Sequence, residues 1–228
     1  MMILSSDPKI QAFKVDCMGF MRDKPNKFWD LAIVDPPYGI GEDGHCRTRK
    51  KHNYTVVHKP KKWDTERPSK EYFNELKRVS KNQIIWGANY FTEFLPPSMG
   101  WVFWDKKIGG DFSDGELAYT SFDRALQMVS IWSGNNNENK IHPTQKPVKL
   151  YEWILTKYAK PGFKILDTHG GSMSLAIACY NLGFDLDICE MDSDYFKEAT
   201  DRVKAHIAKP KGLFTYKETM RTEPNKLF

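Results

Sequence analysis

The sequence predicts a single α/β domain with a doubly wound, mostly parallel sheet, and three observations lead to this class. Short apolar runs typical of fully buried strands, such as Leu31–Val34, alternate with amphipathic helical segments. A strand, a glycine turn, a helix and a second strand follow one another over residues 165–190. The 228 residues suit one domain with a sizeable core. We expect this domain to span residues 1–208, with a polar, basic tail at 209–228.

The amino-terminal half is predicted to contain mainly strands, with one helix between them. Residues 12–18 alternate apolar and polar positions, which predicts a short strand with Asp16 near its carboxyl end. A turn or cap residue before a loop is the alternative at Asp16. An amphipathic helix is predicted over 69–79, with Ser69 as its cap. Later strands are predicted at 83–86, 101–104 and 126–132, with a helical turn at 90–94 after the first of them.

The carboxyl-terminal half is predicted to alternate helices and strands. Pro147 opens a helix, at a position where its missing amide donor costs nothing. An apolar stripe continues that helix to about Tyr158. The elements expected after it are a strand ending at Asp167, a helix stopped by Gly183, a strand ending at Glu190 and a final helix with Ser193 as its cap.

The tetrapeptide Asp35-Pro36-Pro37-Tyr38 closes the predicted strand at Leu31–Val34. Ligands in open parallel sheets bind beyond the carboxyl ends of the strands, so Asp35 is placed to face such a crevice. The two prolines hold the chain extended and present carbonyl groups without amide donors. A carboxylate, a proline carbonyl and an aromatic ring can together bind a planar ring that carries an amino group. By itself the tetrapeptide is equally compatible with a strand that ends in a proline turn.

Residues 165–190 have the arrangement of a nucleoside-binding unit. Glu190 follows the second strand about 20 residues beyond the glycines, where an acid binds ribose hydroxyls. The turn His169-Gly170-Gly171-Ser172-Met173 lacks the glycine spacing that serves a dinucleotide pyrophosphate. A cofactor without phosphate fits this turn better, and S-adenosylmethionine is such a cofactor.

A basic segment at about 42–62 follows Tyr38 almost directly. Between His45 and Lys62 the chain has seven Lys or Arg and no acid. A basic loop beside a candidate site suits a phosphate backbone, because phosphate contacts provide most of the salt-dependent affinity for nucleic acid. A solvated loop without that role is the alternative. The candidate DNA-binding residues are Arg47, Arg49, Lys50, Lys51, Lys59, Lys61 and Lys62.

Composition limits the remaining classes of protein. The formal net charge of +5 is modest for the chain as a whole and matters only where it clusters. The four cysteines form no C-x-x-C pair, which favours reduced thiols and no disulfide framework. His and Cys at 45, 46, 52 and 58 match no zinc-finger spacing, so no metal is expected. No leader or membrane-spanning stretch is apparent, so we expect a soluble protein without a membrane partner.

Three motifs in a fixed order resemble the amino-methyltransferases of DNA. They are Asp35-Pro36-Pro37-Tyr38, then His142-Pro143-Thr144-Gln145-Lys146-Pro147, then Asp167-Thr168-His169-Gly170-Gly171-Ser172 with Glu190. The order, catalytic motif first and cofactor motif last, is similar to the circularly permuted β group of adenine-N6 enzymes. The compact chain resembles the small phage and prophage members of that group. The resemblance covers about residues 16–203.

This resemblance implies a fold, an activity and a role for each matching residue. The fold is the Rossmann-like sheet of class I S-adenosylmethionine-dependent methyltransferases, with a catalytic half at about 10–135 and a cofactor half at about 142–208. The activity is methyl transfer from S-adenosylmethionine to the N6 amine of a flipped adenine in DNA, which we expect to be double-stranded. Such an enzyme acts in the cytoplasm of a bacterial or phage-infected cell.

Within the catalytic half, Asp35 and the carbonyl of Pro36 would bind the target amine, beside Pro37, and Tyr38 would stack on the base. When two acceptors bind the hydrogens of the amine, the lone pair on its nitrogen becomes free to attack a sulfonium methyl group. The implied cofactor residues are Asp16 at the adenine edge, Glu190 at the ribose, Asp167 and Gly171 near the methionine part, Lys146 near its carboxylate, and Asp35, His169, Gly170 and Ser172 beside them.

Two departures from the pattern of the family bear on how well and where such an enzyme works. His169 replaces an aromatic residue and Met173 replaces the last glycine of the usual cofactor turn. Between residues 132 and 142, where larger relatives carry a target-recognition domain, only a short loop remains. We expect a short target site or little sequence preference, read by 42–62 and by residues 105–116. Cytosine-N4 transfer, action on RNA, a nucleic-acid-binding relative without catalysis, and the choice between monomer and homodimer stay open.

Overall fold

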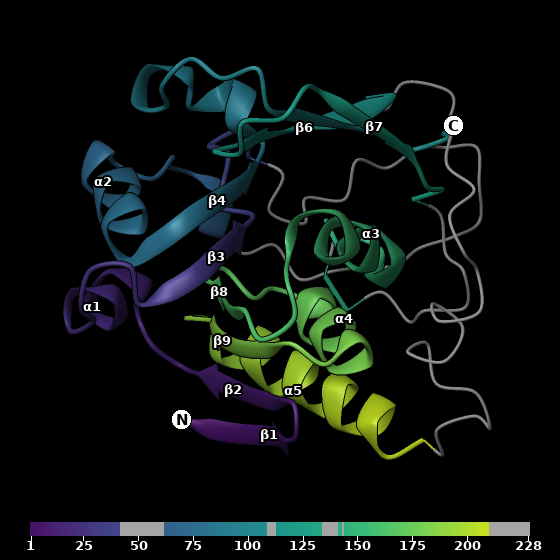
Figure 1. Ribbon diagram of the computed structural model, residues 1–228. Coiled ribbons are helices and arrows are strands. Elements are labelled where there is room, and N and C mark those ends of the chain that lie inside the picture. Colours follow the sequence, from purple (N-terminus) through teal and green to yellow (C-terminus); the bar gives the residue numbers. More distant parts are fainter. Residues whose placement is uncertain (42–61, 109–112, 134–140, 143, 210–228) are drawn as a thin grey trace.

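The computed structural model describes residues 1–41, 62–108, 113–133, 141–142 and 144–209. The strands in these residues are β1 (Met2–Ser6), β2 (Lys9–Phe13), β3 (Trp29–Val34), β4 (Ser80–Trp86), β5 (Trp101–Asp105), β6 (Gly115–Thr120), β7 (Gln127–Ser130), β8 (Lys164–Asp167) and β9 (Asp185–Cys189). They form one nine-stranded sheet in the order β1-β2-β9-β8-β3-β4-β6-β5-β7 (Figure 1). The pairs from β2 to β4 in this order are all parallel, which confirms the predicted fold class.

Helices cover both faces of the sheet, as Figure 1 shows. They are α1 (Cys17–Arg22), α2 (Lys70–Val79), α3 (Val148–Tyr158), α4 (Ser174–Leu182) and α5 (Ser193–Ile207), with single 3-10 turns at η1 (Lys62–Asp64), η2 (Ala88–Tyr90) and η3 (Thr92–Phe94). Strand β3 separates two cores because its side chains alternate between faces. Leu31 and Ile33 pack with α3, α4 and α5, whereas Ala32 and Val34 pack with α1 and α2.

The parallel strands bring distant parts of the chain to one edge of the sheet. Strand β8 and strand β9, joined by α4 near the end of the described chain, lie between β3 and the amino-terminal β2. Because parallel strands point the same way, their carboxyl ends share this edge. The residues there are Asp35 after β3, Gly87 after β4, Asp167 at the end of β8 and Glu190 after β9. The parallel order of the strands therefore places Asp35, Asp167 and Glu190 at the same edge of the sheet.

The predicted strand at residues 12–18 is wrong, because β2 ends at Phe13 and α1 begins at Cys17. The alternative for Asp16 holds instead: its side chain accepts a hydrogen bond from the main chain of Gly19 at 2.8 Å and caps α1. Val15, one of the alternating apolar positions behind that prediction, is 38% exposed. A short carboxylate that satisfies a free N–H of the first helical turn competes here with the alternating apolar pattern.

Several other predicted elements are confirmed, with small changes at their ends. Helices α2, α3 and α4 occupy the predicted segments, and Gly183 ends α4 with a left-handed φ of 78°. The prediction that Ser193 caps the last helix is wrong, since Asp192 is the cap and accepts from the main-chain N–H of Asp194 and Tyr195, each at 2.9 Å. Strands β1 and β6 and helix α1 were not predicted.

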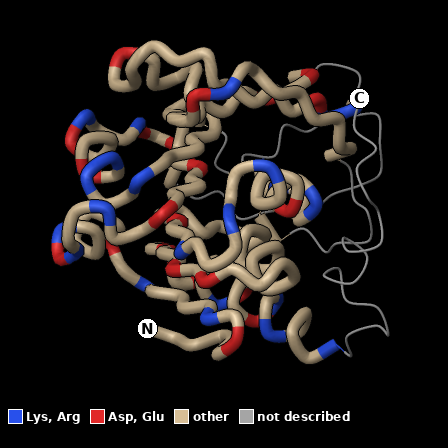
Figure 2. The backbone as a smooth tube through the Cα atoms, in the orientation of Figure 1, with Lys and Arg blue, Asp and Glu red and all other residues tan. Residues whose placement is uncertain are grey.

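Charge and hydropathy add two further observations on the described chain. Figure 2 shows acidic and basic residues interspersed over the helices and strands. None of the described helices has the length and apolarity that would let it span a lipid bilayer.

Candidate active site

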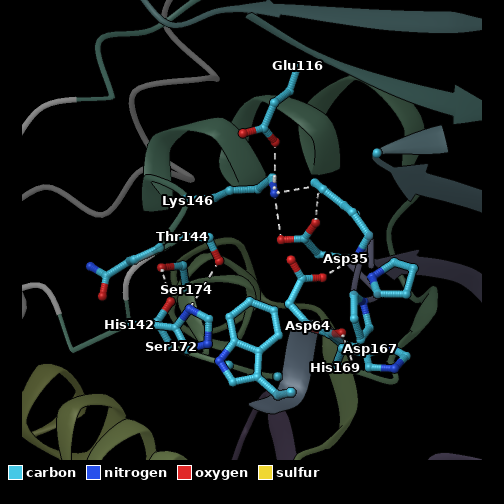
Figure 3. Close-up of a pocket in the computed structure, with 18 of the residues that line it drawn as sticks. Asp35, Asp64, Glu116, His142, Thr144, Lys146, Asp167, His169, Ser172 and Ser174 are labelled. Carbon is cyan, nitrogen blue, oxygen red and sulfur yellow. Dashed lines mark hydrogen bonds and ion pairs between the residues drawn. The ribbon is translucent and has the colours of Figure 1, made fainter. Parts of the chain in front are cut away.

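A cavity of about 1600 Å³ lies at the carboxyl edge of the parallel strands. Its walls contain residues from both halves of the chain, among them Asp35, Tyr38, Lys146, Asp167 and Glu190. The three motifs found in the sequence therefore border one space, and Figure 3 shows their side chains around it. Within the described ranges, no group of three or more His, Cys, Asp or Glu side chains is placed to hold a metal ion.

Asp35 uses both carboxylate oxygens in this structure. The Tyr38 hydroxyl donates to Oδ1 at 2.6 Å, and the Lys146 ammonium donates to Oδ2 at 2.5 Å (Figure 3). The preceding Val34 is buried at the end of β3, so the strand fixes where the carboxylate starts. An ionised carboxylate has about four acceptor sites, so further donors can still bind. Asp35 is thus an acceptor already oriented by a cation and a hydroxyl group.

Lys146 lies between two carboxylates rather than at the surface. Its side chain is 3% exposed, and its Nζ lies 3.0 Å from Glu116 Oε2 as well as beside Asp35. Burial lowers the pKa of Lys146, but the carboxylates of Asp35 and Glu116 outweigh burial and hold that pKa above its ordinary value. Lys146 is therefore charged across the physiological range.

Glu116 on β6 completes this charged group from the far side of Lys146. Lys106 approaches its other carboxylate oxygen, Oε1, at 2.7 Å. Burial acts to raise the pKa of Glu116, but Lys146 and Lys106 together hold it below its ordinary value. Sequence analysis placed Glu116 at the end of a segment, 105–116, expected to read the target, and not beside Lys146, because β6 was not predicted. The first three residues of Gly115–Thr120 are half-buried and the last three are buried, so this strand lacks the alternation by which a sequence indicates a half-buried strand.

The Tyr38 ring lies in a tight aromatic setting. Its centroid is 5.1 Å from that of Tyr90, with the two rings inclined by only 16°, and Phe91 contacts it edge-on at 6.1 Å. Gly87 lies against the ring, since a Cβ at this position would stand 2.1 Å from Tyr38 Cε1. The Tyr38 ring is therefore held between main chain and aromatic neighbours at the cavity wall.

Asp64 supports the same turn and was also missed by sequence analysis. It is 2% exposed, and its Oδ1 accepts hydrogen bonds from the main-chain N–H of Tyr38 at 2.7 Å and Gly39 at 2.8 Å. The available sequence signal was weak: Asp64 is the first acid after the basic segment that runs from residue 45 to 62.

The glycine turn between β8 and α4 brings the main chain close to β9. The Gly170 N–H donates to the carbonyl of Cys189 at 2.7 Å, and a Cβ at Gly170 would lie 3.1 Å from that same oxygen. Gly171 has a φ of 49° and donates its N–H to Glu190 Oε2 at 2.8 Å. The other carboxylate oxygen of Glu190 accepts from the Asp192 N–H at 2.8 Å. The turn and the acid are thus bound to each other.

Two titratable groups with shifted pKa values, buried Asp167 and half-buried His169, begin the same turn. Burial raises the pKa of Asp167 to about 8, and the nearby carboxylates of Asp35 and Glu190 add to this effect, although the His169 N–H bond to Asp167 opposes it. Burial also lowers the pKa of His169 to about 4. His169 is therefore neutral near pH 7, and its Nδ1 lies 2.9 Å from the Thr168 hydroxyl.

The remaining predicted cofactor residues lie around this turn. Asp16 borders the cavity while it caps α1, and Ser172 borders it with its hydroxyl 3.2 Å from that of Ser174. Met173 is fully buried with a φ of 54° and packs into the core below the turn. Of the seven predicted DNA-binding residues, Lys62 is the first residue of η1, and the other six lie outside the described residues.

Fold and site define an α/β protein of the class I methyltransferase fold, with an acid-lined cavity beyond its parallel strands. The sequence profile of the DNA methylase family, which covers N6 and N4 enzymes, matches residues 80–201. The type II methyltransferase M.HpaI of Haemophilus parainfluenzae is 33% identical over 244 aligned positions, which cover 87% of this chain and 74% of that protein. The chain therefore belongs to the DNA methylase family and is a DNA methyltransferase.

More distant matches include a putative methylase and two solved structures. The putative methylase YubD of Escherichia coli K12 is 23% identical, over 83% of this chain and 88% of its own. The crystal structure of the M1.HpyAVI–SAM complex has a TM-score of 0.58 at 18% identity, covering 85% of this chain and 99% of that one. The cytosine-N4-specific PvuII DNA methyltransferase also has a TM-score of 0.58, at 12% identity, covering 92% and 90% of the two chains. These two likenesses show the fold.

Proposed function

We propose that this protein transfers a methyl group from S-adenosylmethionine to the N6 amine of adenine in DNA. The observation that carries the proposal is the oriented carboxylate of Asp35 in the same cavity as the Gly171–Glu190 pair. One group accepts hydrogen bonds from an amine, and the other offers an acid and a close main chain to a nucleoside. The two groups are far apart in the sequence, and the parallel sheet brings them into one cavity.

The residues around the glycine turn fit the proposed cofactor. The main chain at Gly170 approaches β9 so closely that a Cβ would crowd Cys189 and Ile188, and Gly170 and Gly171 both border the cavity. Glu190 would bind the ribose hydroxyls, and Asp16 would border the adenine. Asp167 would lie near the methionine part. S-adenosylmethionine supplies a methyl group activated on a sulfonium sulfur.

The chemistry of this chain's own residues is that of positioning and proton acceptance. The amine of adenine is a weak nucleophile because its lone pair is delocalised into the ring. Asp35 and the Pro36 carbonyl would each accept one of its hydrogens, which makes the nitrogen more pyramidal and frees the lone pair. When the amine nitrogen takes up a methyl group, the Asp35 carboxylate would accept the surplus proton of that nitrogen. Lys146, ion-paired with Asp35, would hold this carboxylate in place beside the amine.

The order of the elements supports the division of labour that we propose. Residues at about 10–135 would hold the target base and those at about 142–208 the cofactor, in the permuted order of the β group. In agreement with that order, β8-α4-β9 lies between β3 and the amino-terminal β2 in the sheet. The basic segment at 42–62 would contact DNA, and its short length favours a short or relaxed target site.

Adenine is proposed over cytosine because the first position of the tetrapeptide is Asp35, whereas cytosine-N4 enzymes more often carry serine there.

The test is to incubate the protein with unmethylated plasmid DNA and labelled S-adenosylmethionine, and to identify the methylated nucleoside by mass spectrometry. N6-methyladenine is the expected product. N4-methylcytosine would replace adenine by cytosine in the proposal, and no transfer despite tight DNA binding would contradict it. An RNA substrate in a parallel incubation distinguishes the two nucleic acids.

Asp35→Ala tests the residue that carries the proposal. Removal of the carboxylate should reduce methyl transfer by roughly a hundredfold or more, because the amine loses its main acceptor. The affinity for S-adenosylmethionine, measured by calorimetry, should change little, since Glu190 and the glycine turn remain. Full activity of Asp35→Ala would contradict the role assigned to Asp35.

A further inference from the structure

The turn after Asp35 depends on an acceptor from another segment. Pro36 and Pro37 have no N–H group, so Tyr38 and Gly39 are the first residues after Asp35 with main-chain donors to satisfy. Both donate to the same oxygen of Asp64, at 2.7 and 2.8 Å.

The main chain of Asp64 forms a further hydrogen bond with the same turn. Its carbonyl accepts from the N–H of Gly41 at 3.1 Å. Because Asp64 is 2% exposed, water does not compete freely for these bonds. Bonds to a carboxylate are shorter and stronger than those between neutral groups. One buried residue thus fixes the path of the chain from Tyr38 to Gly41.

Arg67, three residues further on, holds the aromatic partner of Tyr38. Its Nη1 donates to the main-chain carbonyl of Tyr90 at 2.6 Å and lies 2.9 Å from Glu93 Oε1. The Arg67 side chain also packs against the turn, since a Cβ at Gly39 would lie 2.8 Å from Arg67 Cγ. The segment from Asp64 to Arg67 therefore contacts the main chain on both sides of the Tyr38–Tyr90 stack.

The Tyr38–Tyr90 stack has the geometry of a platform for a planar ring. The two rings are nearly parallel, at 16° and 5.1 Å between centroids, and both border the cavity. Tyr90 is 37% exposed, so the stack reaches from the cavity wall to the surface. The Tyr38 hydroxyl donates to Asp35, so a flipped base bound at Asp35 would lie beside this ring. The main chain that carries the two rings decides where the base can stack.

We propose that Asp64 is a positioning residue for the target base, and that Arg67 has the same role on the Tyr90 side. This inference rests on the proposed function. Asp64 fixes the main chain of Tyr38, and Arg67 fixes that of Tyr90, so the stacked pair and the Asp35 carboxylate keep one relative placement. A misplacement of about 1 Å in such a site can cost a hundredfold in rate.

The test compares Asp64→Ala, Asp64→Asn and Arg67→Ala with the wild-type protein on unmethylated plasmid DNA. Turnover number, KM for DNA, affinity for S-adenosylmethionine and melting temperature are measured for each. Asp30→Ala is the matched control, because Asp30 also accepts a main-chain bond, from the Lys164 N–H at 2.9 Å, but at the opposite end of β3.

Asp64→Ala should lower the turnover number by roughly tenfold to a hundredfold, with little change in affinity for S-adenosylmethionine. Asp64→Asn keeps an accepting oxygen and should recover most of the activity. Arg67→Ala should give a smaller loss, and Asp30→Ala should keep wild-type turnover. A purely structural role would lower the melting temperature and the affinity for S-adenosylmethionine together.

Two results would overturn the proposal. One is wild-type turnover in Asp64→Ala; the other is a loss in Asp64→Ala that Asp64→Asn does not recover at all. If Asp64→Ala fails to fold, Arg67→Ala decides, because it removes an exposed ion pair, one bond to main chain and a side-chain contact with Gly39. Wild-type turnover in Arg67→Ala would then overturn the proposal. If the wild-type protein itself transfers no methyl group, the proposed function falls and the positioning role falls with it.

Discussion

Gly87 is the residue whose size limits the site most directly. It follows β4 with a φ of 63°, and a Cβ there would lie 2.1, 2.4 and 2.6 Å from three atoms of the Tyr38 ring. Real Cβ atoms do not approach other atoms this closely, so any larger residue must displace the ring. The hydroxyl of that ring donates to Asp35 and orients it. A larger residue at Gly87 would therefore disturb Asp35 by displacing Tyr38.

Gly87→Ala should reduce methyl transfer by roughly tenfold or more, because Tyr38 must move away from Asp35. Affinity for S-adenosylmethionine should be retained. Initial rates and calorimetry measure the two effects. Gly162→Ala is the control, since Gly162 has a φ of 83° but no atom within 4 Å of the added Cβ, so it tests backbone strain without the clash. Equal losses in both variants would assign the effect to backbone strain alone.

At the scale of the element, helix α4 is important because it begins at the cofactor turn and ends at Gly183. Six of its residues are buried, so the helix can shift little without disturbing the core. Gly183 stops it in the left-handed region, with its N–H bonded to the Cys179 carbonyl at 2.9 Å. The position of the turn at Gly170 and Gly171 is thus determined by a helix that is fixed at both ends.

Gly183→Ala should destabilise the protein by about 1–2 kcal/mol, the usual cost of a left-handed conformation for a residue with a Cβ. For a domain of this size that corresponds to a fall of roughly 2–8 °C in melting temperature. Gly183→Asn should lose less, because asparagine tolerates this conformation better. Thermal unfolding followed by circular dichroism measures both. An unchanged melting temperature in Gly183→Ala would mean that the chain adapts without strain.

At the scale of the whole molecule, the ionisable groups in the cavity make the free energy of unfolding depend on pH. Asp167 is 4% exposed with a pKa of about 8, whereas the ordinary value is 3.8. Between these two values the folded protein binds a proton at Asp167 that the unfolded chain does not bind. The contribution of Asp167 to the free energy of unfolding therefore falls as pH rises from about 4 to about 8.

Asp167→Asn should remove this pH dependence, because asparagine has no proton to lose. The difference in unfolding free energy, variant minus wild type, should rise with pH by up to roughly 1.4 kcal/mol per unit over that window. His169, with a pKa near 4, acts in the opposite direction below pH 6.5, but it is present in both proteins and cancels in the difference. Denaturant unfolding from pH 5 to 9 measures it. A difference that does not change with pH would show that Asp167 is ionised throughout.

Much of the site was predictable because it depends on strand ends. Asp35, Asp167 and Glu190 each follow an apolar run, and parallel strands bring such ends together. Asp16 was placed near the same edge, but the strand assigned before it was too long. The local helix cap at Asp16 outweighed an alternating pattern of only a few residues.

The contacts that orient the acids were not predictable in the same way. Glu116 lies on β6, which pairs antiparallel with both β4 and β5, so its approach to Lys146 depends on a strand order that no local pattern records. Asp64 meets the turn at Tyr38 from a separate segment of chain. Lys146 was expected beside a cofactor carboxylate, and the structure places it on Asp35 and Glu116. The direction of a side chain is set by its packing neighbours.

The sequence by itself determined the fold class, the set of strand-end acids and the resemblance to DNA methyltransferases, because these follow from periodicity and short motifs. Only the tertiary structure decided how Asp35 is held, by Lys146 and Tyr38, and how Tyr38 is held, by Gly87, Tyr90 and Asp64. The physical reason is that hydrogen bonds and ring contacts act over a few ångströms. Residues far apart in the chain meet at such distances only after the sheet has formed.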